Sequence, residues 1–135
     1  MTVKYLFDII KKMDEQQISK SLRDFIVNVV NTSLKAEVLS FLYYNPFALF
    51  SASMLARALG REQQQIEECL QDLVAAGIIE QITPQGAYKT TTSSKKFALI
   101  KEFMRLYTKP EGKKIFRKLL EESFYYVIKF RKVSR

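Results

Sequence analysis

Three consecutive glutamines, Gln63, Gln64 and Gln65, follow Arg61 and begin a stretch of regularly spaced apolar residues. A glutamine side chain can make two hydrogen bonds to the edge of an adenine, and an arginine can do the same with a guanine. These four residues are therefore candidates for contacts to the bases of double-stranded DNA. The alternative is that they are ordinary solvated polar residues on an exposed turn.

Three lysines that follow in the sequence, Lys89, Lys95 and Lys96, are candidates for contacts to phosphates. Such contacts supply much of the affinity of a protein for DNA. Lys95 and Lys96 fall in the first turn of a predicted helix, where the helix dipole disfavours positive charge, so another use of them is indicated. Two more basic clusters, at 113–118 and 129–135, could flank DNA in a dimer. The alternative is a solvated helix face for the first cluster and a disordered end for the second, and for the second cluster this alternative is favoured.

The amino-acid composition gives little indication of an enzyme. The chain has no histidine, which is the commonest general base and zinc ligand. Cys69 falls on an apolar helical stripe, which favours a buried structural thiol over a redox sensor. Adjacent carboxylates such as Glu67 and Glu68 point in different directions on a helix, and the four glycines form no phosphate-binding loop. We therefore expect no enzyme, no catalytic residue, no metal and no cofactor.

Apolar residues at intervals of three and four predict the helices that position these groups. Thr32 or Ser33, and later Ser51, are suitable N-caps, and Gly60 is a suitable terminator. The short apolar segment 47–50 is expected to be a brief strand or a buried loop. In this first part of the chain the predicted helices span about 3–13, 18–31, 33–45, 52–59 and 63–76.

A β-hairpin and two more helices are predicted beyond Gly77. Residues 78–82 and 87–91 are rich in β-branched and aromatic residues, and the segment from Thr83 to Gly86 fits a type I turn between them. Ser93 or Ser94 is expected to cap a helix over about 94–107. Thr108 and Glu111 form a potential capping box for a last helix that ends near residue 131.

The order of helices, glycine turn and hairpin resembles the winged helix-turn-helix superfamily over residues 33–92, and in particular bacterial and archaeal regulators of the MarR type. The likeness rests on Ser51-Ala-Ser-Met-Leu-Ala-Arg-Ala-Leu-Gly60, on the spacing Ile66…Leu70…Leu73…Ala76-Gly77, and on Gly86-Ala-Tyr88. It implies a mainly α-helical fold with a small β-hairpin, in which the winged-helix core is flanked by N-terminal helices and a long C-terminal helical extension. In that superfamily the third helix enters the major groove of DNA and the hairpin touches the backbone.

The distribution of charge argues against the simplest version of that mechanism. Residues 1–85 hold 8 Lys and Arg against 10 Asp and Glu, a balance of −2, whereas residues 86–135 hold 14 against 4, a balance of +10. The predicted third helix and its preceding residue carry Glu62, Glu67, Glu68 and Asp72, and the hairpin turn has no charge. If DNA is bound, phosphate contacts must come from elsewhere in the molecule.

We expect three segments packed as one unit: N-terminal helices over 1–32, the winged-helix domain over 33–92, and basic, aromatic-rich helices over 93–135. Of the 17 aromatic residues, 8 lie beyond residue 92, which suggests that the last helices also pair two copies of the chain. The alternative is that the last helix folds back on the N-terminal helices and completes a monomeric core.

Two hypotheses follow from the sequence. The first is a homodimeric DNA-binding transcriptional regulator in which Arg61 and Gln63–Gln65 contact bases while the three lysines hold phosphates. The second is a protein-interaction module whose acidic third helix docks a basic partner. A single cysteine, the absence of a signal-like start and the absence of a long apolar run lead us to expect a cytoplasmic protein without membrane contact.

Overall fold

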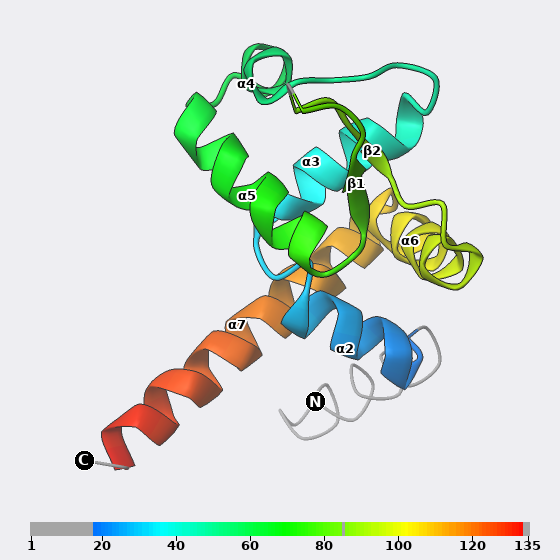
Figure 1. The fold of residues 1–135 in the computed structure, drawn as a ribbon. Helices are drawn as coiled ribbons and strands as arrows, with labels where there is room; N and C mark the ends of the chain where they lie inside the picture. Colours follow the sequence, from blue (N-terminus) through cyan, green and yellow to red (C-terminus); the bar gives the residue numbers. More distant parts are fainter. Residues whose placement is uncertain (1–17, 85, 134–135) are drawn as a thin grey trace.

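The computed structural model describes residues 18–84 and 86–133, and from residue 123 onward only the helical backbone. The helix predicted over 3–13 lies outside these residues. Within them, six helices and one two-stranded antiparallel sheet are formed (Figure 1). The elements are α2 (Lys20–Asn28), α3 (Ser33–Tyr44), α4 (Ala52–Leu59), α5 (Gln63–Ala75), β1 (Ile79–Gln81), β2 (Tyr88–Thr90), α6 (Ser94–Tyr107) and α7 (Pro110–Val133).

Helices α3, α4 and α5 pack against one another, and the hairpin lies against α3 and α5. In the sheet, Ile79 pairs with Thr90 and Gln81 pairs with Tyr88. Phe50 forms an additional single bridge to Tyr88. Three helices followed by a two-stranded flap are the winged-helix arrangement, so the predicted fold class is confirmed.

Side-chain caps fix several helix ends at the positions expected from the sequence. The hydroxyl oxygens of Thr32, Ser51 and Ser93 accept hydrogen bonds from the backbone amides at the starts of α3, α4 and α6. Gly60 ends α4 with a φ of 64°, a left-handed conformation that glycine adopts without steric cost. Helix α2 is shorter than expected and begins after Ser19, whose hydroxyl caps it.

One local prediction is wrong, and a second is confirmed only in part. Thr108 does not begin α7, because its hydroxyl donates to the carbonyl of Met104 and the residue closes α6 instead. The segment 47–50 is not a buried loop, since the Phe47 side chain is fully exposed and Leu49 is half exposed. The alternative prediction for this segment was a brief strand. Phe50 agrees with it, because it forms a single β-bridge to Tyr88.

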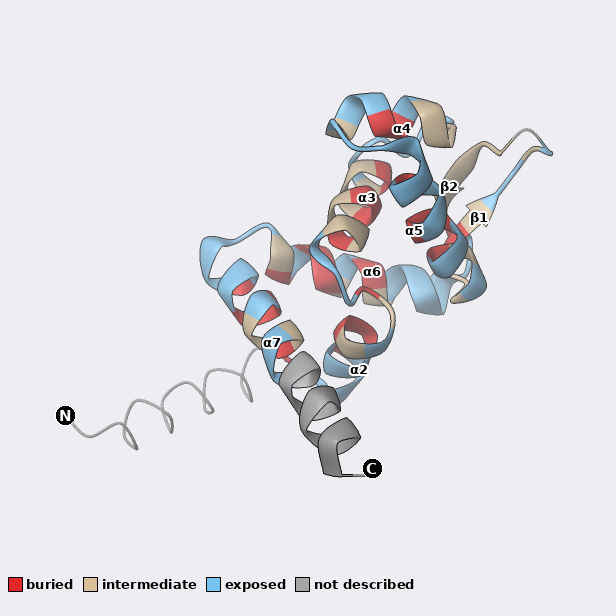
Figure 2. Cartoon of the chain, turned by 90° about the vertical axis from the view of Figure 1, so that its left-hand side faces the viewer, coloured by how far each residue is buried: buried red, intermediate tan, exposed pale blue. Residues whose placement is uncertain are grey.

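Helices α2, α6 and α7 form a second layer below the three-helix unit (Figure 1). The rings of Phe25, Phe103 and Phe116 meet edge to face at its centre. The first half of α7 therefore folds back on α6 and on α2, the one predicted N-terminal helix that lies within the described residues. The buried faces of these helices are continuous with those of α3 and α5 (Figure 2).

None of the described helices is, on its own, long and apolar enough to cross a membrane. Helices α2 and α3 pass such a test of length and composition only when they are joined, and they are bent by 113° at the break between them.

Candidate nucleic-acid interface

Helix α5 turns one side to the core and the other to solvent. The side chains of Ile66, Cys69, Leu70 and Leu73 are buried, as their spacing predicted. Burial raises the pKa of the Cys69 thiol, which keeps it protonated and unreactive. The structure therefore supports the prediction of a structural thiol, and the opposite side of α5 is free for contacts.

The three glutamines are exposed, but they point in different directions. Residues three and four apart share a face of a helix, so Gln63 lies in one row with Glu67 and Gln71. Gln64 points outward, and Gln65 lies on the side of the helix that carries Asp72. The glutamines therefore do not form one reading surface.

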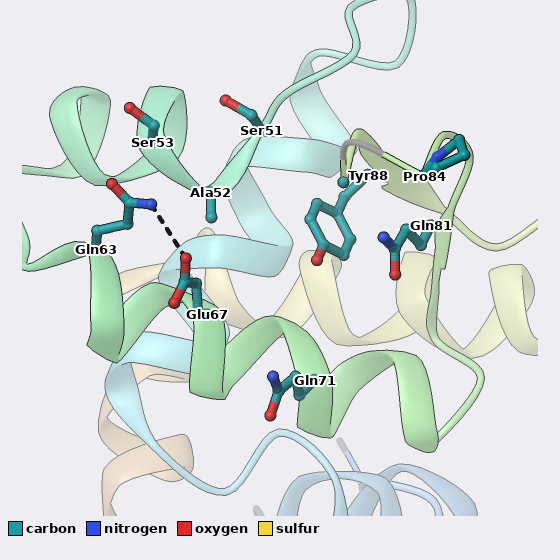
Figure 3. Close-up of a pocket in the computed structure, with 10 residues that line it drawn as sticks. Ser51, Ala52, Ser53, Gln63, Glu67, Gln71, Gln81, Pro84 and Tyr88 are labelled. Atoms are coloured by element: carbon teal, nitrogen blue, oxygen red, sulfur yellow. Dashed lines mark hydrogen bonds between the residues drawn. The ribbon is translucent and has the colours of Figure 1, made fainter.

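A groove of about 380 Å³ separates the Gln63 row from the hairpin (Figure 3). The start of α4 closes its end, and the hairpin forms the far wall. No lysine or arginine among the described residues lines it. Its lining consists of Ser51, Ala52, Ser53, Gln63, Glu67, Gln71, Gln81, Pro84, Gly86 and Tyr88.

The centre of the groove is acidic and partly ordered by a hydrogen bond. The side-chain amide of Gln63 donates from Nε2 to Oε1 of Glu67 over 3.1 Å. On the opposite wall, the side chains of Gln81 and Tyr88 extend toward α5 (Figure 3). A ligand in this groove therefore meets a carboxylate, two or three amides and a phenol.

Arg61 lies outside the groove, where it forms an ion pair with Glu37 of α3. Its Nη2 is 3.3 Å from Oε2 of Glu37, and both side chains are partly exposed. A second ion pair of 3.1 Å joins Lys35 of α3 to Asp72 of α5. Helix α3 thus offsets two charges with its own side chains. Glu37 offsets the charge of Arg61 just before α5, and Lys35 offsets that of Asp72 near the end of α5.

The three lysines proposed to hold phosphates are not gathered around the glutamines. Lys89 is half buried in β2, opposite Glu80. The ammonium group of Lys96 lies against Gly77, just beyond the C-terminus of α5. That position is about 20 Å along α5 from Gln63. Lys95 is exposed in the same turn as Lys96.

The hairpin base is held by a carboxylate. Glu80 accepts hydrogen bonds from the backbone amide and the hydroxyl of Thr92, at 3.2 and 2.9 Å. Both hydrogen bonds lower the pKa of Glu80, and the bond from the backbone amide has the larger effect. The charge of Lys89 makes a smaller contribution in the same direction. The contact ties β1 to the segment that enters α6, and it thereby fixes where Lys95 and Lys96 emerge.

Four residues that line the groove were not among the predicted DNA-contact residues, namely Glu67, Gln71, Gln81 and Tyr88. The spacing of Gln63, Glu67 and Gln71 was a usable signal, because such a row must occupy one face. The contribution of Gln81 and Tyr88 depends on how the hairpin stands over α5, and no local pattern reports that.

No protein-family model and no curated protein matches this sequence. Solved structures, however, are similar to it over the full chain. MepR, a transcription regulator of the multidrug efflux pump MepA of Staphylococcus aureus, has a TM-score of 0.51 and 18% sequence identity, with all of both chains covered.

A MepR mutant bound to an oligodeoxyribonucleotide has a TM-score of 0.51 and 19% identity, and the alignment covers 100% of this chain and 99% of that one. The reduced form of MarR from Escherichia coli has a TM-score of 0.52 and 16% identity, with 99% and 96% covered. Both proteins are winged-helix transcriptional regulators of the MarR family. The present chain has the fold of that group, as the resemblance in its sequence implied.

Proposed function

We propose that this chain is a DNA-binding transcriptional regulator that binds a duplex across α5 and the hairpin. The observation that carries the proposal is the likeness over the whole chain to MepR, one structure of which contains an oligodeoxyribonucleotide. The exposed side of α5, with polar side chains and no apolar patch of its own, is compatible with the edges of base pairs in a major groove.

In this proposal, Gln63, Gln64 and Gln65 contact bases on different sides of α5. Arg61 joins them only by exchanging its partner Glu37 for DNA. Lys89, Lys95 and Lys96 hold phosphates along the hairpin and at its base, which extends the contact beyond the acidic centre of the interface.

A second component of the proposal is a homodimer that pairs through the C-terminal helices. The first half of α7 is used within the chain, where Ile115, Phe116 and Leu119 are buried. Its second half extends away from the other described helices (Figure 1). The sequence of that half contains apolar and aromatic residues from Phe124 to Phe130. An extended apolar helix of this kind is suited to pairing with a second copy.

The direct test is a titration of fluorescent random duplex DNA with the full chain at two salt concentrations. Neutralised phosphates release counterions, so the affinity is expected to fall steeply as salt rises. Lys95→Gln with Lys96→Gln should weaken binding to all sequences and reduce the salt slope by about two. The variant Lys101→Gln with Lys114→Gln, which removes the same charge elsewhere, is the matched control.

Absence of binding at low salt would contradict the proposal. It would then favour the second hypothesis, a protein-interaction module that uses the acidic third helix.

A further inference from the structure

Glu67 occupies the middle of the groove between α5 and the hairpin. It lies between Gln63 and Gln71 in the same helical row, and Figure 3 shows its carboxylate directed into the groove. One carboxylate oxygen accepts the hydrogen bond from Gln63. The other has no hydrogen-bond partner among the described residues, so it remains able to accept from a ligand.

In the part of the chain that the structure describes, no positive charge offsets that of Glu67. None of the ten residues that line the groove is a lysine or an arginine, and no ion pair joins Glu67 to any residue in the described part of the chain. This distinguishes it from Asp72, whose charge is offset by Lys35. A duplex laid across α5 and the hairpin therefore meets an uncompensated negative charge.

A carboxylate in that position discriminates strongly among the groups that DNA presents. Phosphates are repelled by it, and so are the major-groove acceptors of guanine and thymine. Adenine offers an amino donor, but acceptors flank it on both sides. Cytosine offers an amino donor with a C–H group on one side, so it is the base that suits a carboxylate best.

We propose that Glu67 is a specificity-determining residue, an inference that rests on the proposed function. It restricts binding to DNA that presents a cytosine amino group opposite the centre of the groove. Gln63, besides its own proposed contact to a base, orients this carboxylate through the hydrogen bond that its amide donates. The acidic third helix then contributes to sequence specificity. It lowers the affinity for DNA in general, and it tolerates one kind of base pair at the position opposite Glu67.

The test compares the wild-type chain, Glu67→Gln and Glu68→Gln in selections from randomised duplexes, followed by titrations of the selected sites. The wild type is expected to prefer cytosine at one position of the site by about tenfold over other bases. In Glu67→Gln the preference should move to adenine, since a glutamine can bond both the amino group and the ring nitrogen of that base. Binding to random duplexes should also tighten severalfold.

Glu68→Gln is the matched control, because it removes the same charge from the next residue of α5 and does not line the groove. It should tighten binding to random DNA without moving the base preference. An identical base preference in the wild type and in Glu67→Gln would overturn the inference, and so would the same shift in both variants. A wild-type chain that binds no DNA at low salt would instead show that the proposed function itself fails. Equal thermal unfolding of the three proteins checks that the fold is retained.

Discussion

At the scale of single residues, Arg61 was predicted to contact a DNA base, but in the structure its guanidinium group is paired with Glu37. Both side chains are partly exposed, so the pair contributes little to stability, on the order of 1 kcal/mol or less. In the proposed complex, it competes with DNA for the guanidinium group. Arg61 must then leave Glu37 before it can contact a base.

Replacing Glu37 with glutamine is therefore expected to strengthen DNA binding. The variant frees Arg61 and removes one negative charge, and a gain of up to about fivefold corresponds to the strength of such an exposed pair. Fluorescence anisotropy with a labelled duplex measures the change. In an Arg61→Ala background the same substitution should gain much less, and an equal gain in both backgrounds would disprove competition for the arginine.

Cys69 gives a prediction about pH. Burial raises its pKa in the folded chain, so the folded state retains the proton longer than the unfolded state does. The resulting stabilisation is complete below the ordinary thiol pKa of about 8.5 and is lost as pH rises through the higher folded value. Urea unfolding between pH 7 and 9.5 should show this loss, and it should be smaller in Cys69→Ala.

The range stops at pH 9.5 because burial also raises the pKa of Tyr107, whose ionisation would add a loss of the same sign at higher pH. An equal pH dependence in the wild type and in Cys69→Ala would show that the thiol is not its source.

At the scale of elements, the corner between α6 and α7 depends on a glycine inside a helix. Gly112 is buried in the first turn of α7, and a Cβ atom there would collide with the carbonyl oxygen of Leu106. Close approach of the two backbones thus sets the angle between the helices.

Gly112→Ala is expected to destabilise the chain by about 1–3 kcal/mol, the usual cost of forcing an extra carbon into a packed contact. Urea unfolding measures it. Lys114→Ala, at an exposed position of the same helix, should change stability by less than about 0.5 kcal/mol. If the two variants were equally stable, the close contact would not govern the corner.

The helix ends show what sequence can predict and what it cannot. Ser51, Gly60 and Ser93 act through hydrogen bonds or backbone angles within a few residues, so their roles follow from local chemistry. Thr108 satisfied the same local rules for a capping box, but it is the C-cap that ends α6. The role of Gly112 could not be predicted, because it depends on the close approach of the backbone of α6 at Leu106.

In the candidate interface too, some features follow from local sequence and others depend on contacts between distant residues. Exposure of Gln63, Gln64 and Gln65 followed from the apolar stripe on the other side of α5. The partner of Arg61 is 24 residues away in the sequence, and the position of Lys96 against Gly77 depends on the path of the chain after the hairpin. Contacts of that kind leave no local pattern to predict them.

At the scale of the whole molecule, the long helix α7 leads to a prediction about assembly. The mass in solution, measured by light scattering, is expected to be twice the 15.8 kDa of one chain. Phe124→Glu with Val127→Glu would place charges on the extended half of α7 and should return the mass to that of one chain. A single-chain mass for the unaltered protein at all concentrations would contradict pairing.

Glu37 stands between two parts of the molecule that are far apart in sequence. One neighbour is Arg61, and the other is Tyr107 at the end of α6, where the charge of Glu37, after burial, helps to raise the pKa of the phenol. If Arg61 leaves for a DNA base, the carboxylate acts on Tyr107 with its full charge. The nuclear magnetic resonance signals of the Tyr107 ring are then expected to shift on addition of DNA, and unchanged signals would contradict this consequence.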